Sequence, residues 1–185
     1  KFNIGCDTEV SVAGDLNNDG LDDFVISTIM FPETDLSYKL LVYFQNEDGI
    51  GNDTVILDYK YQNWFGPDAN DIGDFDNNGL VDIVIPMANM IFIYYQITEK
   101  EFSRTEIVVG EQAHAVRAGD LNNDGLADLV STMYNKNHFT VFYQNNDGTL
   151  SATDQKGALL IQATREIDRT YRFYGSKENQ GLQGA

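Results

Sequence analysis

The chain has 185 residues, of which 42% are hydrophobic, and this is enough to bury the core of one domain or slightly more. Its 29 acidic residues outnumber its 12 basic residues and give a net charge of −17. This charge argues against a nucleic-acid partner, because phosphate contacts need clustered Lys and Arg. The single cysteine, Cys6, excludes an internal disulfide framework. No apolar run reaches the roughly 18 residues that a transmembrane helix needs.

The chain begins with two predicted strands, at residues 2–4 and 9–13, which the turn-forming residues Gly5 and Asp7 separate. The sequence Phe-Asn-Ile-Gly at 2–5 has the pattern of Ile-Val-Val-Gly at 107–110, which precedes a later acidic loop by the same distance. We therefore predict that residues 1–5 are the last strand of a preceding repeat. We also expect the chain to be a mature product or a fragment.

A repeating unit follows, in which an acidic loop stands between predicted strands. Residues 24–26, after the first loop, form a short apolar run typical of a strand that is buried on both faces. The turn Gln-Asn-Glu-Asp-Gly at 45–49 predicts a hairpin between two further strands. The second and third units repeat this order, and the third has the turn Gln-Asn-Asn-Asp-Gly at 144–148. The predicted strands are 9–13, 24–26, 40–44 and 54–57, then 69–72, 83–85, 91–96 and 106–109, and finally 115–118, 129–130 and 139–143.

The period of the loops predicts the fold class. The loops recur after roughly 46–59 residues, a spacing typical of propellers, solenoids and arrays. Four strands per unit favour an all-β protein, a β-propeller with four-stranded blades. One blade cannot bury both faces of its sheet alone, so blades must stack around an axis. Residues 1–154 supply three clear blades where propellers have four to eight, so we expect an incomplete propeller.

The end of the chain, residues 155–185, has a different composition. It carries 5 basic and 3 acidic residues, against 7 and 26 in residues 1–154. It also lacks the acidic loop. We predict either a divergent partial blade or a docking tail.

The three acidic loops are the candidate metal sites. They read GDLNNDGLDD from Gly14, GDFDNNGLVD from Gly73 and GDLNNDGLAD from Gly119. Counted from the Asp after the first Gly, side-chain oxygens occupy positions one, three, five and nine. These are Asp15, Asn17, Asp19 and Asp23; Asp74, Asp76, Asn78 and Asp82; and Asp120, Asn122, Asp124 and Asp128. An oxygen-only set favours a hard cation, above all calcium, so we predict about three calcium ions.

Glycine at position six of each loop permits a sharp turn. The turn lets the following backbone carbonyl join the ligand shell. The glycines are Gly20, Gly79 and Gly125, and the carbonyls are those of Leu21, Leu80 and Leu126. The second loop has Asn78 where the other two have Asp, from which we expect a weaker site.

The EF-hand is the main alternative for such a loop, and the sequence argues against it. An EF-hand loop ends on a bidentate Glu at position twelve. Here position twelve holds Ile26, Ile85 and Ser131. The flanking residues also have the pattern of strands. The last side-chain ligand is therefore predicted to be the Asp at position nine.

The pattern G-D-x-[ND]-x-[ND]-G-L-x-D, inside a repeat of four strands, resembles the FG-GAP and VCBS repeats of integrin α-subunit propellers and bacterial extracellular proteins. Residues 15–26 are closest to the integrin type, whereas residues 141–148 look more like the VCBS form. The resemblance covers residues 1–154. The Phe-Gly…Gly-Ala-Pro signature survives only as Phe65-Gly66-Pro67, so an integrin-like ligand mode is not carried over.

The resemblance implies structural calcium and an extracellular or cell-surface location. Extracellular calcium modules bind at about 0.1–1 mM, so such sites fill outside cells and stay empty in cytosol. We expect no catalysis, because the chain has no H-E-x-x-H, no G-x-S-x-G and no phosphate-cradling loop. His114 and His138 are expected to be surface or packing residues, and Asp22 to face solvent. Aromatic residues at 59–65, among them Trp64, predict blade packing or, alternatively, a sugar-stacking surface.

These features predict a calcium-stabilised extracellular binding or adhesion module for a protein or glycan partner. Two alternatives stay open. The chain could be the propeller part of a secreted carbohydrate-active enzyme. It could also be a structural subunit of a surface assembly, completed by blades from the same or another chain.

Overall fold

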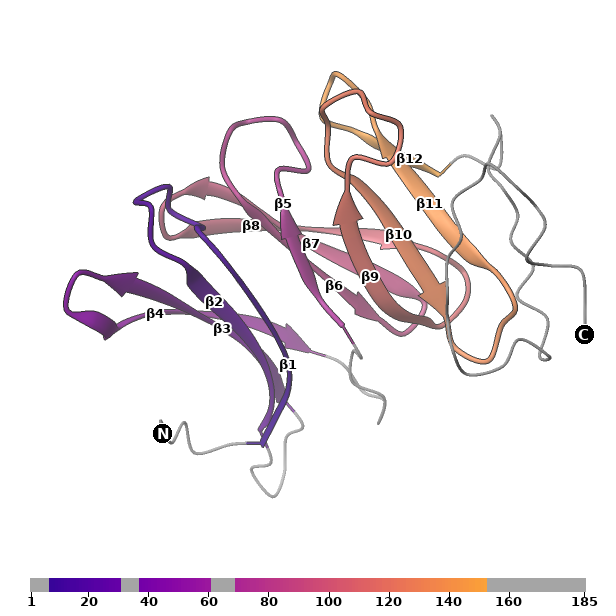
Figure 1. Ribbon diagram of the computed structural model, residues 1–185. Helices are drawn as coiled ribbons and strands as arrows, with labels where there is room; N and C mark the ends of the chain where they lie inside the picture. The colour runs from indigo at the N-terminus through magenta and orange to yellow at the C-terminus, as the bar shows by residue number, and fades with distance from the viewer. Residues whose placement is uncertain (1–6, 31–36, 61–68, 153–185) are drawn as a thin grey trace, which may run out of the picture.

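The computed structural model describes residues 7–30, 37–60 and 69–152, which form twelve strands in three four-stranded sheets (Figure 1). The described residues contain no helix that could cross a membrane. The predictions for residues 1–5 and 155–185 lie outside this part of the chain, as do those for Cys6 and Trp64. The fold class was predicted correctly: the protein is all-β, and its sheets are blades of an incomplete propeller.

Each sheet is antiparallel, and its strands follow one another in chain order. The first sheet contains β1 (Asp7–Gly14), β2 (Asp23–Met30), β3 (Ser37–Asn46) and β4 (Gly49–Lys60). The second contains β5 (Asp71–Gly73), β6 (Asp82–Met87), β7 (Met90–Thr98) and β8 (Glu101–Val108). The third contains β9 (Ala113–Gly119), β10 (Asp128–Met133), β11 (Phe139–Gln144) and β12 (Leu150–Ala152). The four strands predicted for each of the first two units are confirmed, although β4 and β8 are longer than expected.

The second sheet lies between the other two, and both of its faces are buried. Ile83, Ile85 and Phe92 pack in one cluster with Val25 and Val42 of the first sheet. Val84, Ile91 and Ile93 of the same sheet pack in another cluster with residues of the third sheet, among them Val116, Leu129 and Phe142. All six residues of β6 are buried. An apolar run without alternation is the expected pattern of such a strand.

The prediction that residues 24–26 are buried on both faces was wrong. Val25 is fully buried, but Phe24 and Ile26 are only half-buried. These two residues point away from the second sheet, because successive side chains of a strand alternate between its faces. Phe24 instead stacks on Tyr43 of the neighbouring strand, with ring centroids 4.9 Å apart. No second described sheet covers this face.

The first strands of the three sheets lie side by side, as the first strands of propeller blades do around their axis (Figure 1). Ala69, just before β5, forms a parallel bridge with Ala115 of β9, and the Val116 N–H donates to the Ala69 carbonyl over 3.2 Å. The Asp71 carboxylate accepts the Ala118 N–H over 2.9 Å. These bonds fix the second and third sheets relative to each other and bring the acidic loops to the same end of the three sheets.

Candidate metal sites

Each acidic loop connects the first and second strands of its sheet, and the carboxylate at position one organises it. Both oxygens of Asp15 accept backbone N–H groups, from Asp19 over 3.0 Å and from Gly20 over 2.9 Å. Asp74 and Asp120 make the same pair of bonds in their loops, over 2.9–3.0 Å. The loops therefore share one conformation, as their spacing predicted.

Two residues in each loop have a left-handed backbone. The glycines at position six have φ of 88°, 85° and 87°. The asparagines at position four, Asn18, Asn77 and Asn123, have φ of 58°, 59° and 61°. Asn tolerates this conformation better than most residues, because its short polar side chain bonds locally. We did not predict a role for these asparagines, although the same residue at position four of all three loops was a usable signal.

The side chains at positions three and five form an Asn–Asp pair in every loop. In the first and third loops the Asn at position three donates its amide N–H to the Asp at position five, over 3.0 and 2.8 Å. In the second loop the order is reversed, and Asn78 at position five donates to Asp76 at position three over 3.2 Å. Asp76 at position three of the second loop replaces the charge that Asn78 lacks, so each loop has three carboxylates among its four predicted side-chain ligands. A count of charges therefore gives no reason for a weaker second site, and its relative affinity stays a prediction.

The Asp at position nine is fully buried in all three loops and accepts two backbone N–H groups. One comes from position two of the loop and the other from a Gln at the end of the third strand. The donors are Leu16 and Gln45 for Asp23 (3.0 and 2.8 Å), Phe75 and Gln96 for Asp82 (2.7 and 2.8 Å), and Leu121 and Gln144 for Asp128 (3.0 and 2.9 Å). This Asp therefore joins the loop to the third strand of its own sheet.

Sequence reasoning identified this Asp but missed its partner glutamine. A signal was present, because each Gln directly follows two aromatic residues: Tyr-Phe-Gln, Tyr-Tyr-Gln and Phe-Tyr-Gln. Gln96 and Gln144 are buried, and the Gln144 side chain also accepts the N–H of Ala127, at position eight of the third loop, over 2.9 Å. The glutamines therefore support the loops from the third strand.

The second loop brings three carboxylates together. One oxygen each from Asp74, Asp76 and Asp82 lie within 4.8 Å of one another. In the described residues, the carboxylates of the first and third loops, where Asn occupies position three, are not all this close. The positions of the carbonyls of Leu21, Leu80 and Leu126 are untested, so their role as ligands stays a prediction.

The electrostatics of the loops favour a bound cation. The pKa of Asp82 is raised to about 7, mainly by burial and in part by the nearby charges of Asp76 and Asp74, against the lowering effect of the two N–H donors. Burial likewise raises the pKa of Asp76, with Asp74 adding to the effect, and burial raises the pKa of Asp23. Each shift reflects a carboxylate that lacks compensating positive charge. A hard divalent cation would supply that charge, and the oxygen donors fit it.

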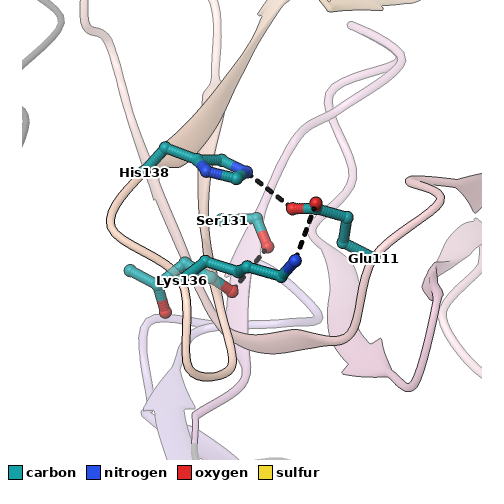
Figure 2. A network of polar contacts seen from close by, with 5 residues as sticks. Glu111, Ser131, Lys136 and His138 are labelled. Atoms are coloured by element: carbon teal, nitrogen blue, oxygen red, sulfur yellow. Dashed lines mark hydrogen bonds and ion pairs between the residues drawn. The ribbon is translucent and has the colours of Figure 1, made fainter.

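The histidines lie away from these loops. His138 Nε2 is 2.6 Å from Glu111 Oε2, and Lys136 Nζ is 3.2 Å from Glu111 Oε1 (Figure 2). The Glu111 oxygen next to His138 is buried, and it has a hydrogen bond only if Nε2 carries the proton. Lys136 and His138 lower the pKa of Glu111. This network joins the β8–β9 connection to the β10–β11 connection of the third sheet, a packing role like the one predicted for His138.

A comparison with known families identifies the repeat. Residues 74–131 match the family described as FG-GAP-like repeat. The matched segment begins at position one of the second loop and extends past the third loop into β10, so it spans one full period. The loops at 14–23, 73–82 and 119–128 share their hydrogen-bond pattern, so the first sheet carries the same motif as the matched segment. Residues 74–131 are therefore an FG-GAP-like repeat, and this match supports the resemblance of the chain to the FG-GAP/VCBS repeats.

Proposed function

We propose that this chain is a calcium-stabilised, extracellular binding module. The observation that carries the proposal is the second loop, where three carboxylates have oxygens within 4.8 Å of one another. The same ligand pattern occurs in all three loops. Asp, Asn and backbone oxygens are the ligands of calcium, which accepts six to eight of them in flexible geometry. Magnesium demands a tighter octahedral arrangement and keeps several waters, so it fits these loops less well.

The role of the cation is structural. Each loop joins two strands, and its position-nine Asp bonds to a third, so a bound ion holds three of the four strands of a blade. Mutual repulsion of the three carboxylates opposes this arrangement when no cation is bound. Binding free energy therefore adds to folding free energy. A ligand at 100 times its Kd stabilises the folded state by about 2.7 kcal/mol per site.

The expected affinity and the fold support the proposed location and partner. Sites of about 0.1–1 mM affinity are filled outside cells, which supports a secreted or cell-surface protein. The partner is a protein or glycan that binds to loops on one face of the blades. The proposal assigns no catalytic role to this chain and no nucleic-acid partner.

Thermal unfolding in excess calcium, excess magnesium and excess chelator tests the proposal. We expect calcium to raise the Tm by at least about 5 °C over chelator, and more than magnesium does. The variant Asp74→Asn should lose part of this shift, because it removes a position-one carboxylate. Asp22→Asn is the matched control, since Asp22 is exposed and outside the ligand set. Equal Tm in calcium and chelator would contradict the proposal.

The binding role needs a separate measurement. Labelled chain is applied to immobilised glycans and to extracellular-matrix proteins in calcium. We expect saturable binding to one of these classes and loss of binding in chelator. Absence of binding to either class, by a chain that calcium has been shown to stabilise, would contradict the binding role and leave the metal role intact.

A further inference from the structure

The second acidic loop contains Asn78 followed by Gly79, and this is the only Asn-Gly pair in the chain. In such a pair the backbone nitrogen of the glycine can attack the side-chain carbonyl carbon of the asparagine. Glycine hinders this attack less than any other residue, because it has no Cβ beside its nitrogen. The first and third loops have Asp19 and Asp124 before the equivalent glycine, so they carry no amide group at this position.

The reaction exchanges the amide for a carboxylate, consumes one water molecule and releases ammonia. The Gly79 nitrogen loses its proton and forms a bond to Asn78 Cγ. The bond from Cγ to Nδ2 breaks, and Nδ2 takes up a proton and leaves as ammonia. Water then opens the five-membered imide ring at either of its two carbonyls. One product has aspartate at position 78, and the other has isoaspartate, in which the backbone is one carbon longer.

Three hydrogen bonds hold the Asn78 side chain in the closed loop. Its Nδ2 donates to Asp76 Oδ2 over 3.2 Å and to the Gln96 carbonyl over 3.0 Å. Its Oδ1 accepts the Leu80 N–H over 2.7 Å. Ring closure moves Cγ and expels Nδ2, so it breaks both bonds that Nδ2 donates. The closed loop therefore opposes the reaction at the side chain.

The attacking nitrogen is held as well. The Gly79 N–H donates to Asp74 Oδ2 over 2.9 Å, and the other oxygen of Asp74 accepts the Asn78 N–H over 3.0 Å. Loss of the Gly79 proton would end its bond and place a second negative charge beside the Asp74 carboxylate, at a Coulombic cost. Asn78 and Gly79 are both exposed, so water reaches them. Hydrogen bonds, and not burial, therefore protect the pair.

We propose that Asn78 is a site of spontaneous deamidation, which the closed second loop slows and the opened loop permits. Loops of this kind open at a lower free-energy cost than the sheets that support them, so the reaction does not need global unfolding. Cation binding to the closed loop lowers the population of the open loop, so we expect it to slow the reaction further. This effect of calcium rests on the proposed function.

Deamidation would change the second loop irreversibly. The aspartate product lacks the two bonds that Nδ2 donated, and it places a carboxylate against the carboxylate of Asp76 and the carbonyl of Gln96. All four predicted side-chain ligands of the loop would then be carboxylates, instead of three. The longer backbone of isoaspartate would also displace the Gly79 N–H from Asp74. We therefore expect both products to have a lower Tm than the unmodified chain in chelator.

Incubation of the full chain at mildly alkaline pH tests this proposal, with peptide mass spectrometry to follow the conversion of Asn78. The three conditions are excess calcium, excess chelator, and guanidinium chloride at an unfolding concentration. We expect conversion to be at least about tenfold slower in calcium than in denaturant, because the reaction requires a local opening, and we expect the rate in chelator to exceed the rate in calcium. No conversion in denaturant, or equal rates in all three conditions, would overturn the proposal. Equal rates in calcium and chelator, both below the rate in denaturant, would overturn only the effect of calcium.

Asp74→Asn and Asp120→Asn are a matched pair, because each removes a position-one carboxylate but only Asp74 bonds to Gly79. Under conditions in which circular dichroism shows both variants to be folded, Asn78 should convert severalfold faster in Asp74→Asn than in Asp120→Asn. Equal rates would overturn protection by the Asp74 bond. Gly79→Ala is measured in denaturant, where its effect on folding plays no part. It should slow the conversion, because a Cβ crowds the attacking nitrogen, and an unchanged rate would overturn the ring-closure route.

Discussion

β6 in the second sheet and β2 in the first sheet begin with closely similar sequences, Asp-Ile-Val-Ile and Asp-Phe-Val-Ile, yet they are buried differently. All four residues of β6 are buried, whereas β2 buries Asp23 and Val25 and leaves Phe24 and Ile26 half-buried. The difference arises from the neighbours. A described sheet covers each face of β6, and only one face of β2. The same strand sequence therefore contributes different amounts to stability in the two sheets.

The largest expected difference concerns Ile85 and Ile26, which occupy equivalent positions in the two strands. Ile85→Ala should lower the free energy of unfolding by about 2–5 kcal/mol, as for a fully buried residue. Ile26→Ala should cost clearly less, because Ile26 already contacts solvent. Equal costs in chemical denaturation would show that the first sheet is as well covered as the second.

The next prediction compares the stability cost of removing the position-nine carboxylate in the second sheet with the cost of removing it in the third sheet. Asp82→Ala leaves the buried N–H groups of Phe75 and Gln96 without their acceptor, at a cost of about 1–3 kcal/mol. Asp128→Ala should cost less, because the exposed Leu121 can turn its N–H to water. Urea unfolding in chelator measures this difference without a contribution from calcium. A larger cost for Asp128→Ala would contradict the comparison.

A third prediction uses the reversed Asn–Asp pair of the second loop. Asp76→Asn and Asn78→Asp each break the complementary pair, so each should change the affinity of the second site for calcium. The double variant restores the order found in the other loops. We expect a coupling free energy of about 0.5–3 kcal/mol between the two substitutions, measured by calorimetric calcium titration. Strictly additive effects would show that the pair does not act as a unit.

The smallest effect concerns the Glu111 network between the second and third sheets. Lys136 and His138 lower the pKa of Glu111 below its ordinary value of 4.5. The contact therefore stabilises the fold above pH 4.5, and this contribution is lost as the pH falls through the lowered pKa. Glu111→Gln should lower the Tm slightly at neutral pH and not at acid pH. Glu101→Gln, at an exposed site on β8, is the control; a deficit that persists in acid would exclude a charge effect.

The sequence predicted what depends on local chemistry. The ligand spacing, the sharp turn at Gly20 and its equivalents, and the hairpin at 45–49 follow from residues that are close in the chain. The bond from Gln45 to Asp23 was not predictable in this way, because it joins a backbone N–H of one strand to a side chain of another. Whether a neighbouring sheet covers Phe24 and Ile26 could not be predicted from the sequence either. It depends on a neighbouring sheet, and the strand sequence carries no information about that sheet.

The bond between the position-nine Asp and the third-strand Gln also bears on the order in which a blade forms. The partners are 22, 14 and 16 residues apart in the three sheets, so the chain must be complete up to the Gln before the Asp can be fixed. All of these separations lie within one blade, and short loops close at little entropic cost. Each blade can therefore complete its own candidate cation site before the next blade has folded, so the three sites need not form in a single step.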